Sequence, residues 1–193
     1  MNLAWPVPMS VSRFGSMSKR AVSSGFGPRP SPGGVGSSNH QGIDIPIDVG
    51  TAVYAVARGT VTEAVSNNPT AGTFITIDHG DGYFTRYLHL SRMDVGVGQT
   101  VKMGTTVGLS GGQPGAWGAG TSTGPHLHFE VWEGGKPFGG GRPVDPLPLL
   151  TREATALARE YWWAIAAGGV GMVALALAFR YRTDIRGYLT GGR

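Results

Sequence analysis

The sequence predicts a mainly β protein: a compact antiparallel β domain followed by one C-terminal transmembrane α-helix. Glycine is abundant, with 33 among 193 residues, and short β-branched runs take the place of any long helical period before residue 150. Residues 161–179 form an apolar stretch without a charged side chain, which predicts the helix. The expected division of the chain is 1–23 (extended N-terminal segment), 24–150 (β domain), 151–160 (linker helix), 161–179 (transmembrane helix) and 180–193 (basic tail).

The strands are predicted from β-rich runs between turn signals. Residues 1–39 are rich in serine, glycine and proline, so we expect an extended, partly ordered segment before the first strand. Arg58-Gly59 and Asp81-Gly82 are each expected to close a β-hairpin, and the sequence EGGK predicts a later turn. The expected strand runs are 51–57, 60–65, 73–78, 83–90, 95–111 (short runs separated by glycines) and 125–132.

The stretch 161–179 has the length of a membrane span. Nineteen helical residues extend roughly 28 Å, close to the thickness of a bilayer's hydrocarbon core. Tyr161, Trp162 and Trp163 stand where interfacial aromatic residues would lie, and Arg180 follows the other end. The alternative is a buried core helix, but a small β domain cannot easily surround a helix that is apolar on every side.

Flanking charge predicts the orientation of this span. Segment 151–160 holds two arginines and two glutamates, whereas the tail 180–193 holds four arginines and one aspartate. The tail is therefore expected in the cytoplasm and the β domain outside. No signal peptide is expected, because residues 1–13 lack an early basic cluster and two prolines interrupt their apolar stretch. The small-residue pairs Ala164/Gly168 and Ala167/Gly171 could support helix-mediated self-association.

Composition limits the possible partners and metal sites. The chain has no cysteine, so any metal must be bound by histidine, aspartate or glutamate. Residues 1–150 hold 10 basic and 9 acidic side chains. A nearly neutral domain offers no basic stripe, and no nucleic acid is expected as a partner.

Histidines mark the candidate site. In the run TGPHLHFEV (123–131), His126 and His128 are two residues apart, so a strand would point both side chains to one face. Upstream, His40 and Asp44 form an HxxxD motif. A straight strand would separate these two by about 13 Å; they can share a metal only if the chain bends, which Gly42 permits. His40, Asp44 and one further imidazole would leave the fourth position of a tetrahedral zinc site open for water.

Three motifs together are more specific than any one of them. The motif HxxxD, the isolated YLHLS around His89, and TGPHLHFE resemble the lysostaphin-like zinc metallo-endopeptidases that cut bacterial peptidoglycan. The resemblance runs from about Ser24 (SGFGPR) to Pro146 (PVDP) and includes the glycine-punctuated stretch 95–111. It implies a compact β half-barrel metallopeptidase domain with one zinc ion per chain.

The resemblance also implies the roles of the five motif residues. Zinc ligands fall on His40, Asp44 and His128, and two non-ligand catalytic histidines fall on His89 and His126. The residue chemistry agrees, because two neutral imidazoles and one carboxylate leave the zinc site with one net positive charge, which activates water. His89 and His126 would then serve as general base and oxyanion stabiliser, in an order that the sequence leaves open.

Other candidates have simpler interpretations. Turn chemistry accounts for His79, and Glu130 is either a solvated strand end or a general base. Tyr83 or Tyr87 could line the cleft, although packing is the simpler interpretation. Loop 111–124 is expected to form a cleft wall, with Trp117 as a substrate contact or a loop anchor.

The expected function is therefore hydrolysis of peptide bonds in peptidoglycan stem peptides or cross-bridges. The setting would be cell-wall remodelling by a single-pass membrane protein whose domain faces the wall, or a virus-encoded, virion-associated lysin. The alternative function is a catalytically silent peptidoglycan-binding or hydrolase-activating module. A glycine-rich carrier-like β domain would not explain three histidine motifs.

Overall fold

The computed structural model describes residues 3–8, 22–31, 34 and 37–150. All regular elements within these residues are β-strands, which confirms the mainly β, antiparallel prediction. The strands are β1 (Gly27–Pro28), β2 (Asn39–His40), β3 (Ile43–Ile45), β4 (Ala52–Tyr54), β5 (Gly59–Asn68), β6 (Gly72–Asp78), β7 (Phe84–Met93), β8 (Thr100–Val101), β9 (Thr106–Ser110), β10 (Leu127–Glu133) and β11 (Arg142–Val144).

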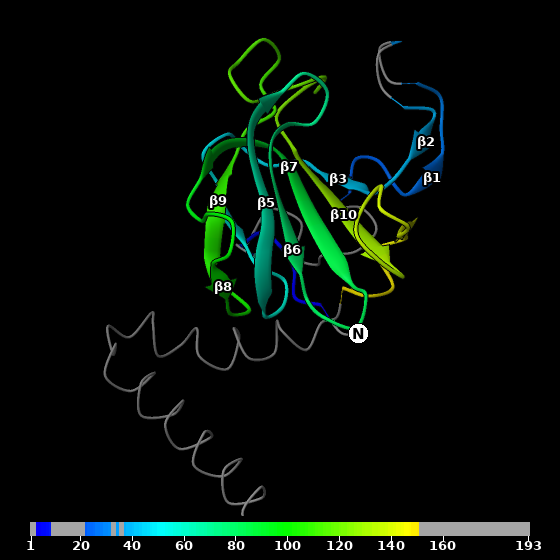
Figure 1. Cartoon of the computed structure of the whole chain (residues 1–193). Coiled ribbons are helices and arrows are strands. Elements are labelled where there is room, and N and C mark those ends of the chain that lie inside the picture. Colours follow the sequence, from blue (N-terminus) through cyan, green and yellow to red (C-terminus); the bar gives the residue numbers. More distant parts are fainter. Residues whose placement is uncertain (1–2, 9–21, 32–33, 35–36, 151–193) are drawn as a thin grey trace, which may run out of the picture. The chain divides into compact units, whose positions relative to one another are not determined.

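One antiparallel sheet dominates the domain. Its strands follow the order β11-β10-β7-β6-β5-β8, while β3 pairs with β10 and β9 joins β4 to β7. The long strands β5, β6, β7 and β10 lie side by side (Figure 1). β1 and β2 form a separate two-stranded sheet.

Of the two predicted hairpins, one is confirmed and one is wrong. β6 and β7 pair with Asp78 opposite Phe84, and Asp81 and Gly82 both adopt positive φ in the turn between them, as a tight hairpin requires. Arg58-Gly59 closes no hairpin, because β4 pairs with β9 and β5 pairs with β6 and β8. Gly59 is needed for close approach instead: a Cβ there would lie 2.4 Å from the Asp78 carbonyl oxygen.

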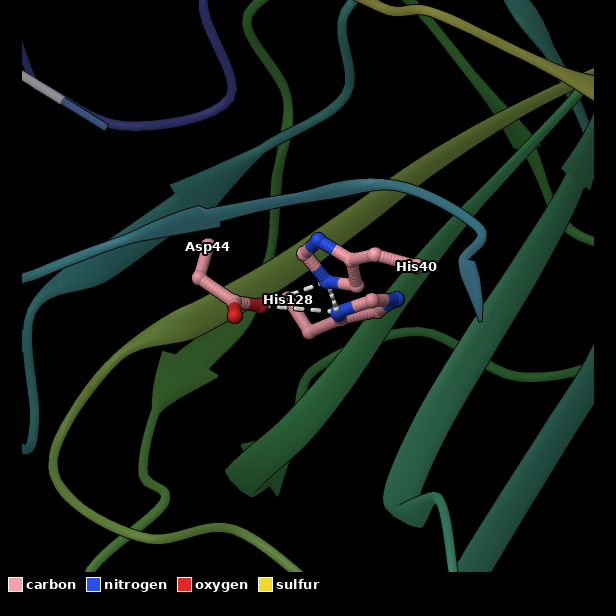
Figure 2. A group of neighbouring side chains, drawn as sticks. All are labelled: His40, Asp44 and His128. Carbon is pink, nitrogen blue, oxygen red and sulfur yellow. Dashed lines mark hydrogen bonds and ion pairs between the residues drawn. The ribbon is translucent and has the colours of Figure 1, made fainter. Parts of the chain in front are cut away.

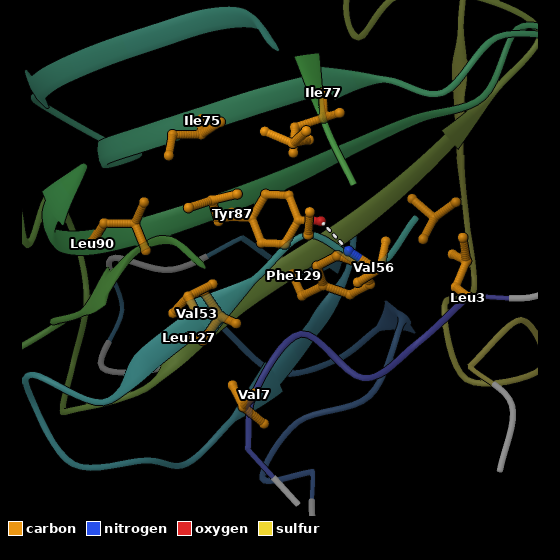
Figure 3. Packing of buried hydrophobic residues seen from close by; sticks show 14 of the residues in the cluster. Leu3, Val7, Val53, Val56, Ile75, Ile77, Tyr87, Leu90, Leu127 and Phe129 are labelled. Carbon is orange, nitrogen blue, oxygen red and sulfur yellow. Dashed lines mark hydrogen bonds between the residues drawn. The ribbon is translucent and has the colours of Figure 1, made fainter. Parts of the chain in front are cut away.

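The two faces of the sheet have different chemistry. Tyr87 and Phe129 pair across β7 and β10 and lie in the hydrophobic core, each with no exposed surface. Figure 3 shows the Tyr87 ring among these apolar side chains, with its hydroxyl accepting the Val56 backbone N–H at 3.1 Å. Side chains alternate along a strand, so the neighbouring pair Arg86 and Glu130 lies on the opposite face. Packing was thus the correct interpretation of Tyr87, and the polar face forms the cleft described below.

His79 belongs to the hydrogen-bonded scaffold of the domain. Its Nδ1–H donates to the Arg58 carbonyl at 2.8 Å, and its Nε2 lies 2.7 Å from the Thr85 hydroxyl. Burial lowers the pKa of His79, although the hydrogen bond to Arg58 opposes that shift. Both ring nitrogens are therefore occupied by structural contacts.

The N-terminal residues of the domain pack against its C-terminal residues. Leu3 is 1% exposed, its backbone N–H donates to the Leu149 carbonyl at 2.8 Å, and it forms a parallel bridge with Leu150. Val7 is also buried in the core. The points where the chain enters and leaves the domain are therefore adjacent.

The predicted linker helix, transmembrane helix and basic tail, residues 151–193, lie outside the described residues. Among the residues that are described, the structure has no helix long and apolar enough to cross a membrane.

Candidate metal centre and active site

A bend between β2 and β3 brings two candidate ligands together. His40 ends β2 and Asp44 is the central residue of β3, with Gln41 and Gly42 turning the chain between them. His40 Nε2 lies 3.2 Å from Asp44 Oδ1. The bend predicted at Gly42 is therefore present, and the glycine is also required by close packing: a Cβ there would lie 2.3 Å from the Phe129 carbonyl oxygen.

β10 supplies the third candidate ligand. β3 and β10 pair with Asp44 directly opposite His128, and His128 Nδ1 lies 2.8 Å from Asp44 Oδ1 and 3.0 Å from His40 Nε2. Figure 2 shows the three side chains converging from β2, β3 and β10. All three residues are buried.

The cluster suits a zinc ion. Ligand bonds of 2.0–2.2 Å in a tetrahedron put donor atoms about 3.3 Å apart, and the three donor–donor distances here are 2.8, 3.0 and 3.2 Å. Small shifts of the side chains would open the triangle to that size. Two imidazoles with one carboxylate are also a donor set that zinc accepts.

Backbone and side-chain partners orient both imidazoles toward the cluster. His40 Nδ1–H donates to the Gly25 carbonyl at 2.7 Å, which leaves Nε2 as the donor atom toward a metal. His128 Nε2–H donates to Glu130 Oε1 at 3.1 Å, which leaves Nδ1 in the same role. Such contacts fix the tautomer and the ring orientation of metal-binding histidines.

Glu130 is a buried partner of the site, not a solvated strand end. It is 3% exposed, and its Oε2 accepts hydrogen bonds from Arg86 at 3.0 Å and Trp132 at 2.7 Å. Burial alone would raise the pKa of Glu130, but the hydrogen bond from His128 and the charge of Arg86 lower it. A carboxylate held in this way orients His128 and is not free to act as a general base.

Mutual contacts keep Asp44 ionised. Burial would raise its pKa, but the contacts of Asp44 with the imidazoles of His128 and His40 outweigh burial and hold the pKa of Asp44 well below its usual range. Burial would likewise lower the pKa of His128, but the hydrogen bonds to Asp44 and Glu130 raise it to about 9. Without a metal His128 is therefore protonated on both ring nitrogens, and a bound zinc ion would displace the proton on Nδ1. The charge of Asp44 is thus available at neutral pH.

His126 lies beside the cluster, immediately before β10. Its Nδ1–H donates to the Gly124 carbonyl at 2.7 Å, and its Nε2 lies 3.5 Å from Asp44 Oδ1. The prediction that His126 and His128 share a face is therefore confirmed. The unprotonated Nε2 of His126 is directed at the space around the cluster.

His89 reaches the same space by a local distortion of β7. Regular alternation would place His89 on the face of Tyr87, in the hydrophobic core. His89 instead has φ +61°, and it lies where the β6–β7 register shifts, between the pair Ile75–Tyr87 and the pair Thr73–Leu90. Its ring centroid lies 5.0 Å from that of His126. A non-glycine residue in this conformation costs on the order of 1–3 kcal/mol, which indicates that the rest of the site holds His89 in place.

His89 is neutral at physiological pH. Its side chain is buried, and burial together with the nearby His126 and His128 lowers its pKa to about 3. A neutral imidazole at this position can donate one hydrogen bond and accept another.

The five histidine and aspartate residues open onto one cleft of about 460 Å³. Loop 111–124 contributes Thr121, Ser122 and Thr123 to its wall, as predicted. Trp117 is 72% exposed and is not among the residues that line the cleft. The other lining residues are Arg29, Ser37, Asn39, Gln41, Glu63, Asn68, Thr70, Ala71, Phe74, Arg86, Leu88, Glu130 and Phe138.

Among the lining residues that sequence reasoning did not single out, three make notable contacts. Arg29 binds Asp44, with its Nη1 3.0 Å from Asp44 Oδ2. Arg86 binds Glu130, and its alternation with Tyr87 could have placed it on the polar face. Phe138 is 73% exposed, adopts φ +58° and packs on Trp132 with ring centroids 5.0 Å apart; no sequence signal indicates its place in the cleft.

Comparisons with known proteins agree with this arrangement. Residues 38–146 match the sequence model of Peptidase family M23. Peptidoglycan DD-endopeptidase ShyA of Vibrio cholerae is 41% identical over 129 residues, covering 66% of this chain and 28% of that protein. Glycyl-glycine endopeptidase ALE-1 of Staphylococcus capitis is 38% identical over 127 residues, covering 65% of this chain and 33% of that protein. The matched region is thus about a third or less of each curated relative.

A solved structure gives the same result for the fold. The crystal structure of a zinc-containing peptidase from Vibrio cholerae aligns with a TM-score of 0.57 at 33% identity, covering 75% of this chain and 39% of that one.

Proposed function

The chain belongs to Peptidase family M23, and from this membership and the geometry of the cleft we propose that it is a zinc-dependent endopeptidase that hydrolyses peptide bonds in bacterial peptidoglycan. The observation that carries the proposal is the convergence of His40, Asp44 and His128 in a cleft that also holds two other histidines. His40, Asp44 and His128 would hold the zinc ion. Zinc bound there would polarise the scissile carbonyl and lower the pKa of a water molecule.

The hydrogen bonds support different roles for the two remaining histidines. His126 donates through Nδ1 to Gly124, so its Nε2 is free to accept a proton from the attacking water. We assign it the role of general base, and after bond cleavage it would return that proton to the leaving amine. His89, kept neutral by burial, would donate an N–H hydrogen bond to the oxygen of the scissile carbonyl as negative charge develops there.

The substrate is proposed to be a stem peptide or a cross-bridge of peptidoglycan. The two relatives are named for different bonds, a DD-endopeptidase and a glycyl-glycine endopeptidase, so both bond classes are candidates. The cleft is lined mostly by polar and charged side chains, with Ala71, Phe74, Leu88 and Phe138 as its apolar residues, which fits a peptide with small and polar residues.

Incubation of the full chain with defined peptidoglycans should release soluble fragments whose new termini, identified by mass spectrometry, show which peptide bond was cut. Peptidoglycans with D-alanyl-diaminopimelate cross-links and with glycine bridges should be compared in parallel. The expected result is that the protein cleaves one of the two cross-link classes. This cleavage should require zinc and should stop when a chelator removes the metal. Stoichiometric zinc binding without cleavage of either class would contradict the enzyme proposal and favour a peptidoglycan-binding or hydrolase-activating module.

We also propose that residues 161–179 attach the protein to a membrane, with the β domain on the cell-wall side. The uncharged stretch and the arginine-rich tail support this orientation, and a peptidoglycan hydrolase needs access to the wall. This arrangement would suit wall remodelling by a cell or wall breaching by a virion.

In cells that express the chain with a tag after Arg193, external protease should digest the β domain and spare the tag. The physical reason is that the basic flank stays on the cytoplasmic side of the bilayer. A protected domain with a digested tag would reverse the orientation, and purification without detergent as a soluble monomer would contradict membrane attachment.

A further inference from the structure

Arg29 occupies a defined place at the metal centre, and we propose that it is a positioning residue that holds Asp44 as a one-oxygen metal ligand and so sets the affinity for zinc. This inference rests on the proposed metal role of Asp44. Arg29 also lies outside residues 38–146, the part of the chain that the family model matches.

The two carboxylate oxygens of Asp44 have separate partners. Oδ1 lies 3.2 Å from His40 Nε2 and 2.8 Å from His128 Nδ1, so it faces the space where a metal would sit. Oδ2 accepts a hydrogen bond from Arg29 Nη1 at 3.0 Å. With Oδ2 held by a guanidinium, the carboxylate cannot easily rotate to present both oxygens to a metal ion.

Arg29 is itself fixed by further contacts. Its Nη1 also donates to the Ser24 hydroxyl, and its Nε donates to the Ser37 carbonyl at 3.4 Å. Its backbone N–H bonds the Ser38 carbonyl at 2.9 Å. The side chain is 18% exposed. Because the planar guanidinium offers several donors at fixed angles, it can bind these groups at once, which a lysine ammonium cannot do in the same geometry.

Other residues of the segment 22–31 contact the same two candidate ligands. Gly27 pairs with His40 across β1 and β2, and the Gly25 carbonyl accepts the Nδ1–H of His40. The Asp44 backbone exchanges hydrogen bonds with Ser23 and Ser24, at 2.9 Å each. The backbone of this segment therefore positions His40 and Asp44, and Arg29 contributes the one charged side-chain contact that the described part of the segment makes with them.

Substitution of Arg29 should weaken zinc binding without removing a ligand. Loss of an outer partner of a metal ligand typically costs 10- to 100-fold in metal affinity. We expect an increase of about that size in the zinc dissociation constant of R29Q, measured by competition with a chelator, and a smaller increase in R29K, whose ammonium can still reach Asp44. The matched control is R92Q, because Arg92 also pairs with an aspartate, forming two hydrogen bonds with Asp94 at 2.6 and 2.9 Å on the surface. The zinc affinity of R92Q should equal that of the parent.

A second readout separates positioning from general stability. In R29Q, Asp44 is free to bind through both oxygens, so the visible absorption of the Co²⁺-substituted protein should weaken as the coordination number rises. The proposal would be overturned if R29Q had the same zinc dissociation constant and the same Co²⁺ spectrum as the parent. It would also be overturned if R92Q lost as much zinc affinity as R29Q. Should R29Q fail to fold, R29K provides the same comparison, and an unchanged dissociation constant there overturns it. If the parent binds zinc and the Arg29 variants bind it equally well, this inference alone is refuted. If the parent binds no zinc, the proposed function is refuted as well.

Discussion

Replacing His128 with alanine is expected to reduce the zinc content of the full chain from about one ion per chain to a trace, as measured by elemental analysis. His128 provides one of three donor atoms that lie within 3.2 Å of one another, and two protein ligands do not hold zinc tightly. The substitution also leaves Glu130, 3% exposed, without its imidazole partner. Hydrolysis of peptidoglycan should be lost together with the metal.

His79→Ala is the matched control for this experiment. His79 is a partly buried histidine with a contact at each ring nitrogen, but it does not line the cleft. Its variant should keep the parent's zinc content even if its stability falls. Unchanged zinc stoichiometry and affinity in His128→Ala would show that the ligand assignment is wrong.

Replacing His126 with alanine is expected to leave zinc bound and to reduce turnover on the order of a hundredfold or more. The reason is that His126 directs Nε2 to the site, 3.5 Å from Asp44 Oδ1, while His40, Asp44 and His128 remain intact. Zinc content and the rate of fragment release should be measured on the same preparation. His89→Ala should likewise keep zinc and lose turnover, because it removes a hydrogen-bond donor for the oxyanion.

The two variants should differ in one further respect if their roles are correctly divided. A general base must be unprotonated to act, so its protonation lowers the rate on the acidic side of the pH–rate profile. In His126→Ala the part of this acidic fall that comes from His126 should disappear. In His89→Ala the profile should keep its shape at a lower rate. Full activity in either variant, or loss of zinc in both, would contradict the assignment of catalysts and ligands.

The sequence predicted the clustering of His40, Asp44 and His128 better than it predicted the path of the chain. His40, Asp44 and His128 were identified from spacing and family resemblance because ligand chemistry restricts the residue types allowed. The Arg58-Gly59 hairpin was wrong because a glycine that permits close packing, here against Asp78, looks the same in sequence as a glycine that permits a turn. Only long-range strand pairing distinguishes the two.

Two other features depend on tertiary contacts that local patterns do not encode. His89 lies in a run of alternating residues, and nothing in that run indicates a left-handed backbone that turns its ring out of the core. Arg29 lies 15 residues from Asp44, in a stretch expected to be extended, and the two meet only because the chain folds back where β1 pairs with β2. Residue type identified the site, whereas distant contacts determined how its parts are held.

Because Leu3 and Leu150 are adjacent, this domain is well suited to insertion into other proteins. A chain that enters and leaves at neighbouring points can be inserted between other segments without moving them far apart. Any sequences joined upstream and downstream would meet at one place on the domain. The same adjacency would permit circular permutation, with residues 3 and 150 joined by a linker of about six residues and new termini opened in the turn at Asp81-Gly82.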